Sequence, residues 1–144
     1  MSAMREKRTR VLVVEDEPEL LRLVKTILEE AGLEVTGVSR EGEAIRQLRA
    51  ERYAVVVTDL YVTRGQEGVE SVGALLEAAG ATPVVVMTGW PVEGEVAEAA
   101  GVVSVLRKPF ELEEVVRAVE GALGRGGVWR GYEADPAERQ GAGV

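Results

Sequence analysis

The chain has 144 residues, a formal net charge of −8, 46% apolar residues and 29% charged residues, which suits one globular domain with a sizeable core. This acidic balance argues against direct nucleic-acid binding, which needs clustered Lys and Arg. Cys and His are both absent. Disulfides, thiolate or histidine metal sites, His-based triads and phosphohistidine on this chain are therefore excluded.

No segment of the sequence signals secretion or membrane insertion. Residues 1–8 form a charged N-terminal extension, and the apolar run that follows lasts about four residues, shorter than the core of a signal peptide. No stretch approaches the roughly 20 apolar residues that span a bilayer. We expect a soluble, cytoplasmic chain without a membrane partner.

Short Val-rich runs alternate with helical patterns, which predicts βαβ units and a parallel sheet. The first strand, over 11–14, leads into a helix that Pro18 can begin and Gly32 can end. An alternating strand at 33–38 then leads into a second helix, which Ser39 can cap. The inward positions of these two helices recur at helical spacing: Leu20, Val24, Ile27 and Leu28, then Ala44, Ile45 and Leu48.

Within the apolar run 53–58, residues 55–57 have no polar interruption, as in a central strand covered on both faces. After it we expect a Gly-containing loop at 63–68, then helices around 69–76, 93–100 and 112–123 and strands at 83–87 and 102–106. The pattern predicts five βα repeats, an α/β three-layer sandwich over residues 9–123. Residues 124–144 are Gly-rich and lack periodicity, so we expect a flexible tail or a truncated linker.

Polar residues gather where the predicted strands end. Glu15 and Asp16 follow the first strand, and Asp59 closes the third. Thr88 and Lys108 follow the fourth and fifth strands. Ligands of an open parallel sheet bind outside the carboxyl ends of its strands, so these groups can share one edge. Three acids, a hydroxyl and an ammonium there would form a divalent-cation site beside a reactive carboxylate.

Four short motifs follow the predicted strands in the order Glu15-Asp16, Asp59-Leu60, Met87-Thr88-Gly89 and Arg107-Lys108-Pro109-Phe110. Together, in this order, they closely resemble a response-regulator receiver domain, the phosphoacceptor half of two-component signalling. The resemblance covers residues 9 to 123 and implies the flavodoxin-like, doubly wound (βα)5 fold with the sheet order 2-1-3-4-5 that chemotaxis receivers have.

The resemblance implies that Asp59 attacks the phosphorus of a phosphohistidine on a partner kinase and becomes an aspartyl-phosphate. An aspartate is normally ionised at neutral pH and needs no general base. It does need relief from the repulsion between two anions, which Mg²⁺ can give. By the same resemblance, Asp16 and Asp59 ligate the metal and Glu15 acts largely through water. The backbone carbonyl of Tyr61 completes the protein ligands.

Thr88 would donate a hydrogen bond to the phosphoryl group, and Lys108 would place a positive charge against it. The implied partners are a histidine kinase or phosphotransfer protein and a downstream protein target or output domain. A homodimer through the face of helices four and five is common in the family. Such a chain is a signalling receiver, not a metabolic enzyme, and catalyses only its own phosphorylation and dephosphorylation.

The sequence departs from the receiver pattern at several positions. Val105 stands where receivers commonly carry Tyr or Phe, three residues before the lysine, which puts the usual transmission route in doubt. The loop after Asp59 lacks the usual proline. Tyr61 and Trp90 border the site, and we hypothesise that their rings obstruct the hydrolytic water and lengthen the phosphorylated lifetime.

The same residues also allow other interpretations. Taken singly, Asp59 could cap a turn, Glu15 and Asp16 could complement a helix dipole, and Lys108 could be a solvated loop residue. The chain could be a pseudo-receiver that binds proteins without phosphorylation. A haloacid-dehalogenase-like phosphatase needs a second Asp where Tyr61 stands. A dinucleotide-binding protein needs a Gly-x-Gly-x-x-Gly after the first strand, which this chain lacks.

Overall fold

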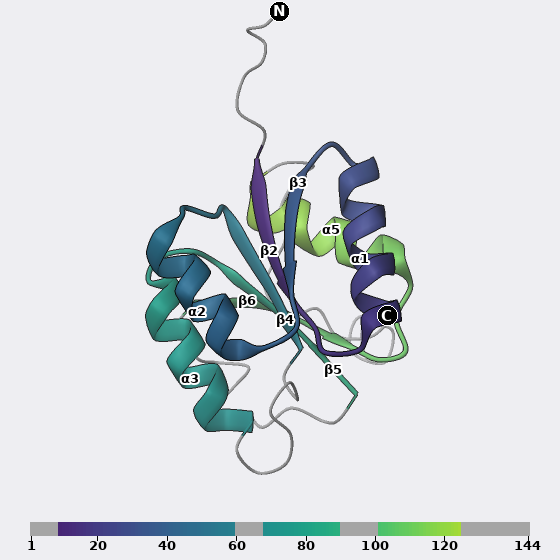
Figure 1. Cartoon of the computed structure of the whole chain (residues 1–144). Coiled ribbons are helices and arrows are strands. Elements are labelled where there is room, and N and C mark those ends of the chain that lie inside the picture. The colour runs from purple at the N-terminus through teal and green to yellow at the C-terminus, as the bar shows by residue number, and fades with distance from the viewer. Residues whose placement is uncertain (1–8, 60–67, 90–100, 125–144) are drawn as a thin grey trace, which may run out of the picture.

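The computed structural model describes residues 9–59, 68–89 and 101–124 (Figure 1). Its strands are β2 (Arg10–Val14), β3 (Glu34–Val38), β4 (Val55–Asp59), β5 (Val84–Thr88) and β6 (Val102–Arg107). Its helices are α1 (Pro18–Glu30), α2 (Glu41–Ala50), α3 (Gly68–Ala79) and α5 (Leu112–Ala122). All neighbouring strands pair in parallel, in the order β3-β2-β4-β5-β6. Counted along the chain this order is 2-1-3-4-5, and the predicted flavodoxin-like fold is confirmed.

The sheet is the middle of three layers. Figure 1 shows α1 and α5 on one face of the sheet and α2 and α3 on the other. Successive side chains of a strand point to opposite faces, so β2 contributes to two separate cores. Val11 and Val13 belong to the cluster beneath α1 and α5, whereas Leu12 and Val14 belong to the cluster beneath α2.

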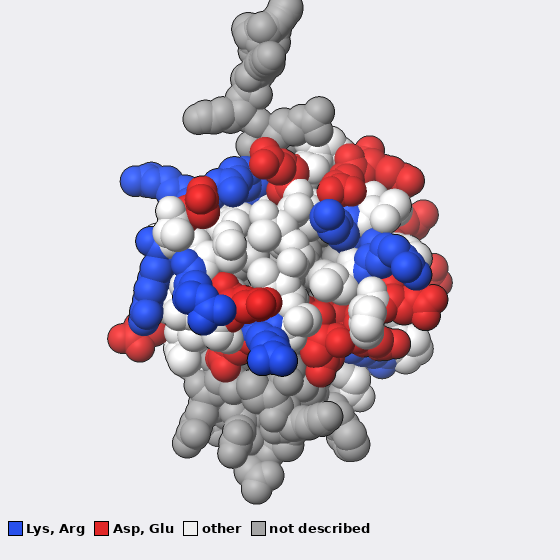
Figure 2. All heavy atoms as spheres, in the orientation of Figure 1, with Lys and Arg blue, Asp and Glu red and all other residues white. Residues whose placement is uncertain are grey.

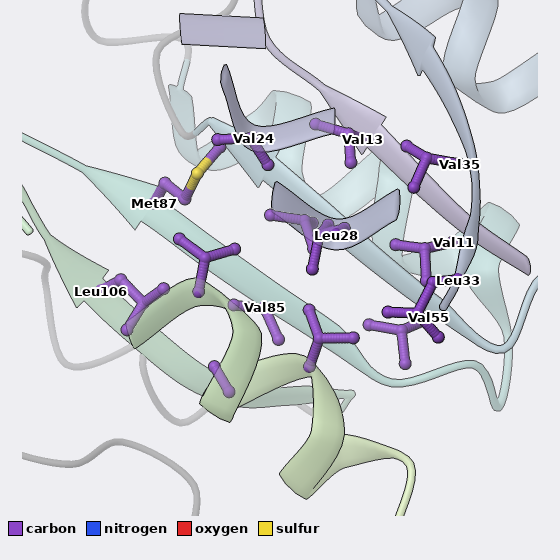
Figure 3. Packing of buried hydrophobic residues seen from close by; sticks show 14 residues of the cluster. Val11, Val13, Val24, Leu28, Leu33, Val35, Val55, Val85, Met87 and Leu106 are labelled. Atoms are coloured by element: carbon purple, nitrogen blue, oxygen red, sulfur yellow. The ribbon is translucent and has the colours of Figure 1, made fainter. Parts of the chain in front are cut away.

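The central strands β4 and β5 are buried along their whole lengths, as predicted for strands covered on both faces. Figure 3 shows the cluster on the α1 side, where Val24 and Leu28 of α1 lie over Val85 and Met87 of β5. Most buried residues of both clusters are valines. Burying one such side chain completely contributes about 1.5 kcal/mol or more, so the core anchors the strand ends firmly.

Of the residues predicted to begin or end the first two helices, Pro18 and Gly32 do so and Ser39 does not. Pro18 begins α1 as predicted, and Gly32 has a φ of +94° just after it, a conformation that glycine adopts without strain. The predicted capping role of Ser39 is wrong. The N-cap of α2 is Arg40, with extended backbone and no side-chain capping hydrogen bond. Because α2 begins only at Glu41, Ser39 lies one residue too early to reach its first amides.

Several predictions fall outside the described residues. They concern the N-terminal extension 1–8, the loop after Asp59, the helix around 93–100 and the tail after Gly124. In the described part of the chain, no helix has both the length and the apolar character needed to cross a membrane.

Strand β6 carries a buried polar residue that the sequence does not explain. Its pairing with β5 shifts register between Val84 and Val85, and after this irregularity Ser104 lies opposite Val85. The Ser104 side chain is fully buried, and its hydroxyl has no hydrogen-bond partner among the described residues. A buried hydroxyl without a partner has lost its hydration without replacement.

We therefore expect Ser104→Ala to stabilise the fold by about 1 kcal/mol, because it removes an unsatisfied polar group and little volume. Chemical denaturation followed by far-UV circular dichroism measures the change. Thr82→Val is the matched control, since the Thr82 hydroxyl donates to the carbonyl of Tyr53 at 3.3 Å and its loss should not stabilise. A destabilised Ser104→Ala variant would show that the hydroxyl has a stabilising partner.

Candidate functional site

Asp59 is the last residue of β4 and lies at the carboxyl edge of the sheet. Its strand is buried on both sides, and the residue itself is only 7% exposed. β4 pairs with β2 on one side and with β5 on the other, so the ends of three strands surround this carboxylate. The position follows from the parallel sheet, because all its strands end at the same edge.

Glu15 and Asp16 follow the neighbouring strand β2. The backbone of Glu15 still donates to the Val38 carbonyl of β3 at 3.0 Å, and its side chain is 1% exposed. The Glu15 Oε2 accepts a hydrogen bond from the backbone N–H of Glu17 at 3.0 Å. This N–H precedes α1, where amides lack partners within the helix. The contact holds the Glu15 carboxylate in place, whereas Asp16 is exposed.

Lys108 reaches the same edge from the far side of β5. Its Nζ lies 3.4 Å from Oδ2 of Asp59 and 3.8 Å from Oε1 of Glu15. Its backbone N–H donates to the carbonyl of Thr88, the fully buried last residue of β5, at 2.7 Å. A single ammonium therefore contacts two buried carboxylates, and the backbone that carries it is bonded to the strand between.

Burial raises the pKa of Glu15 to about 7, because the ionised form is poorly solvated there. The nearby charge of Asp59 raises this pKa further. The Glu17 amide and the Lys108 ammonium act in the opposite direction by stabilising the ionised form. The site thus holds negatively charged groups close together in a buried position, as many functional sites do.

The three acids together fit a hard divalent cation. One carboxylate oxygen from each of Glu15, Asp16 and Asp59 lies within 4.8 Å of the others. The Oε1 of Glu15 is buried, and the Lys108 ammonium lies 3.8 Å from it, beyond hydrogen-bonding distance, so this oxygen can accept a hydrogen bond from a metal-bound water. Carboxylates and water are the ligands that Mg²⁺ prefers.

The structure brings together four of the predicted site residues, Glu15, Asp16, Asp59 and Lys108, and the backbone of Thr88 adjoins them. Tyr61, the predicted carbonyl ligand, and Trp90 lie outside the described residues. Sequence reasoning missed the contact between Lys108 and Glu15. No local pattern could reveal it, since the two residues come from opposite ends of the domain.

Val105 occupies the position where the resemblance expects an aromatic residue. It is 2% exposed and packs with Val84 and Val86 of β5 in the cluster beneath α2 and α3. It is thus an ordinary core residue of β6.

Comparison with known proteins agrees with this geometry. The family model described as the response regulator receiver domain matches residues 11–120. The chain belongs to the receiver domain family. Receiver domains are signalling domains of two-component response regulators, and the match spans all the described strands and helices apart from their outermost residues.

Among curated relatives, this receiver domain is 35% identical to protein-glutamate methylesterase/protein-glutamine glutaminase 5 of Myxococcus xanthus, covering 81% of this chain and 38% of that protein. A receiver protein of Sinorhizobium medicae WSM419 superposes with a TM-score of 0.70 at 26% identity, over 82% of this chain and 96% of the other. The receiver domain of a Pseudomonas aeruginosa PAO1 sensor histidine kinase, solved with a magnesium ion coordinated in its active site cleft, superposes with a TM-score of 0.67 at 24% identity. The superposition covers 82% of this chain and 99% of that one. The matched part is between 27% and 57% of the length of the curated relatives.

The raised pKa of Glu15 predicts how the stability of the metal-free receiver depends on pH. Between about pH 4.5 and pH 7 the folded chain holds a proton that the unfolded chain has released. Stability from this group is therefore present at low pH and lost as pH rises through the folded pKa. In a chelator, Glu15→Gln should stabilise the protein by roughly 2 kcal/mol at pH 8 and by much less at pH 5.

Urea denaturation at the two pH values measures this difference. Glu19→Gln is the control, because Glu19 lies in the first turn of α1 with 72% of its side chain exposed. An equal effect of Glu15→Gln at both pH values would contradict the raised pKa.

Proposed function

We propose that this chain is a phosphoacceptor receiver in which Asp59 takes a phosphoryl group from a histidine kinase with Mg²⁺ bound. The observation that carries the proposal is the meeting of three carboxylates and one ammonium at the carboxyl edge of the sheet. A domain used only for protein contact has no need to bury two acids beside a lysine, since buried charges are costly unless paired.

In the proposed reaction a carboxylate oxygen of Asp59 attacks the phosphorus of a phosphohistidine. The new O–P bond forms as the P–N bond breaks, and the imidazole leaves with the electron pair of that bond and is protonated. β4 holds the nucleophile rigidly because all five of its residues are buried. Positioning contributes strongly to such transfers, since the protein has little covalent chemistry to perform.

Glu15, Asp16 and Asp59 would hold the Mg²⁺ ion. The ion neutralises negative charge on the phosphoryl oxygens and on the acids when bound. The Tyr61 carbonyl, outside the described residues, stays a proposed further ligand. Glu15 acts through water in this scheme, which agrees with the Oε1 that has no hydrogen-bond partner among the described side chains.

Lys108 and Thr88 would serve the phosphoryl group. The Lys108 ammonium pairs with Asp59 at 3.4 Å, and after transfer it would pair with the more negative phosphoryl group that replaces this partner. We propose that the Thr88 hydroxyl then donates a hydrogen bond to a phosphoryl oxygen. Both changes occur at the ends of β5 and β6, so phosphorylation can favour a second arrangement of this edge.

The domain boundaries and partners belong to the same proposal. We take residues 9–123 as the receiver, 1–8 as an extension and 124–144 as a tail or linker. The relatives are longer than the matched part, which supports an output domain or a separate protein target downstream of a kinase or phosphotransfer protein. A homodimer and the cytoplasmic location expected from the sequence stay predictions, as does catalysis limited to its own phosphorylation and dephosphorylation.

Incubation with acetyl phosphate and Mg²⁺ should add the mass of one phosphoryl group to the intact protein, and peptide mapping should place it on Asp59. Asp59→Asn should abolish the modification. Lys108→Ala should slow it by about tenfold or more, since a paired charge at the reacting group typically contributes that much to transition-state stabilisation. Lys25→Ala is the control, because Lys25 pairs with Glu29 on the surface of α1.

The same measurement separates the receiver from a pseudo-receiver. A chain with unchanged mass in the presence of Mg²⁺, and unchanged also after incubation with phosphorylated kinases, would be a binding module that keeps the fold alone.

Mg²⁺ should raise the thermal unfolding midpoint of the wild-type chain, because a ligand that binds only the folded state stabilises it. Asp16→Asn should weaken the apparent affinity by about tenfold or more, since it removes a carboxylate oxygen from a site with few protein ligands. Glu19→Gln makes the same change of charge outside the cluster and should leave the affinity unaltered. Equal affinities for both variants would contradict the proposed ligand set.

A further inference from the structure

A surface depression lies between α1 and α5, away from the phosphoacceptor edge. It has a volume of about 370 Å³. Its lining combines apolar and charged side chains: Ile27, Glu30 and Ala31 from α1, and Glu113, Val116 and Arg117 from α5. Ile27 and Val116 are only partly buried against the core. We call these six residues the α1–α5 groove.

The apolar part of this surface continues along α1. Leu23 is 47% exposed, and it is the exposed large hydrophobic side chain in the described part of the chain. It lies four residues before Ile27, so the two side chains share one face of the helix. A contiguous apolar surface with a charged rim is typical of a place where another segment binds.

We propose that residues 128–132 of this chain bind in the α1–α5 groove, with the Trp129 ring against Ile27 and Val116. Residues 125–144 lie outside the described part of the structure, and their sequence points to this segment. Aromatic residues make up 4% of the chain, yet Trp129 and Tyr132 lie close together in a stretch that is otherwise rich in Gly. A linker that only separates two domains has no use for such residues, whereas an aromatic side chain can bury 150 to about 250 Å² in a groove.

The length of chain between α5 and Trp129 is sufficient. Gly124 follows α5 directly, has a φ of +80° and donates to the Gly121 carbonyl at 3.0 Å, which turns the chain out of the helix. Val116 lies eight residues before Gly124, about 12 Å along the helix axis at 1.5 Å per residue. The five residues from Gly124 to Trp129 span up to about 17 Å when extended. Trp129 is therefore the first aromatic residue of the tail that can reach the groove.

Charge favours the same pairing. Glu30 and Glu113 contribute two carboxylates to the rim against the one guanidinium of Arg117, and Figure 2 shows acidic side chains gathered on the side of the molecule where α1 lies. Arg130 follows Trp129 directly. Exposed ion pairs contribute little energy, but complementary charges set the orientation of a bound segment.

Covalent attachment makes weak contacts sufficient. A short flexible connection keeps the local concentration of the segment in the millimolar range. A second copy of the chain would have to reach that concentration in solution to compete. The binding proposed here does not depend on phosphorylation of Asp59, because none of the groove residues belongs to that site.

The test uses the full chain with Trp90→Phe, which leaves Trp129 as its one tryptophan. Acrylamide should quench Trp129 fluorescence about threefold less efficiently in the native chain than in urea, as expected for an indole largely covered by a groove. Val116→Ser should bring the quenching close to the value in urea, and Glu113→Lys should raise it part of the way. Glu77→Lys, the same charge reversal on α3 at the opposite face of the sheet, should leave it unchanged, and circular dichroism verifies the fold of each variant.

Each other outcome overturns the proposal. Quenching equal to that in urea would show that Trp129 is not bound. Protection that survives both groove variants would place the tail elsewhere. Protection that falls on about hundredfold dilution would identify a second copy as the occupant, since intramolecular binding does not depend on concentration.

Discussion

The contact of the Lys108 ammonium with two carboxylates is the interaction on which the site depends. Lys108 lies 3.4 Å from Asp59 and 3.8 Å from Glu15, and both acids are almost fully buried. Removing the ammonium would leave two buried carboxylates without a compensating charge, which is strongly destabilising. Three strands from distant parts of the chain must therefore end at the same level of the sheet for these charges to be tolerated.

The valine-rich sheet supplies the rigidity that this arrangement requires. β4 and β5 are buried on both faces, so their ends are fixed by packing rather than by the polar groups themselves. The site in turn weakens the metal-free fold, because burial disfavours the ionised form of Glu15 and raises its pKa to about 7. Functional sites commonly lower the stability of a fold locally, and favourable packing elsewhere offsets this loss. A bound cation or a phosphoryl group would change this balance at the edge of the sheet.

The proposed phosphorylation would have to act on the rest of the domain without an aromatic residue at position 105. Val105 is locked into the core with Val84 and Val86, so it has no large side chain to exchange between two positions. The link from β5 to β6 is made instead by the backbone, where Lys108 donates to the carbonyl of Thr88 at 2.7 Å. A shift of Thr88 would therefore move the residue that carries the ammonium. The α1–α5 groove and Val105 lie on opposite faces of the sheet, because the groove is formed by α1 and α5 and Val105 packs beneath α2 and α3.

The sequence by itself determined the order of strands and helices, because valine runs and helical spacing are local patterns that packing then reinforced. It also placed Asp59, Glu15 and Asp16, Thr88 and Lys108 at strand ends, which the parallel sheet brings to one edge. The start of α2 was decided by the backbone at Arg40 rather than by the hydroxyl of Ser39. Only the tertiary structure decided that Lys108 contacts Glu15 as well as Asp59, that Ser104 loses its hydrogen bonds at an irregular pairing, and that α1 and α5 leave a groove. These features depend on distances between side chains far apart in the chain, which no local pattern encodes.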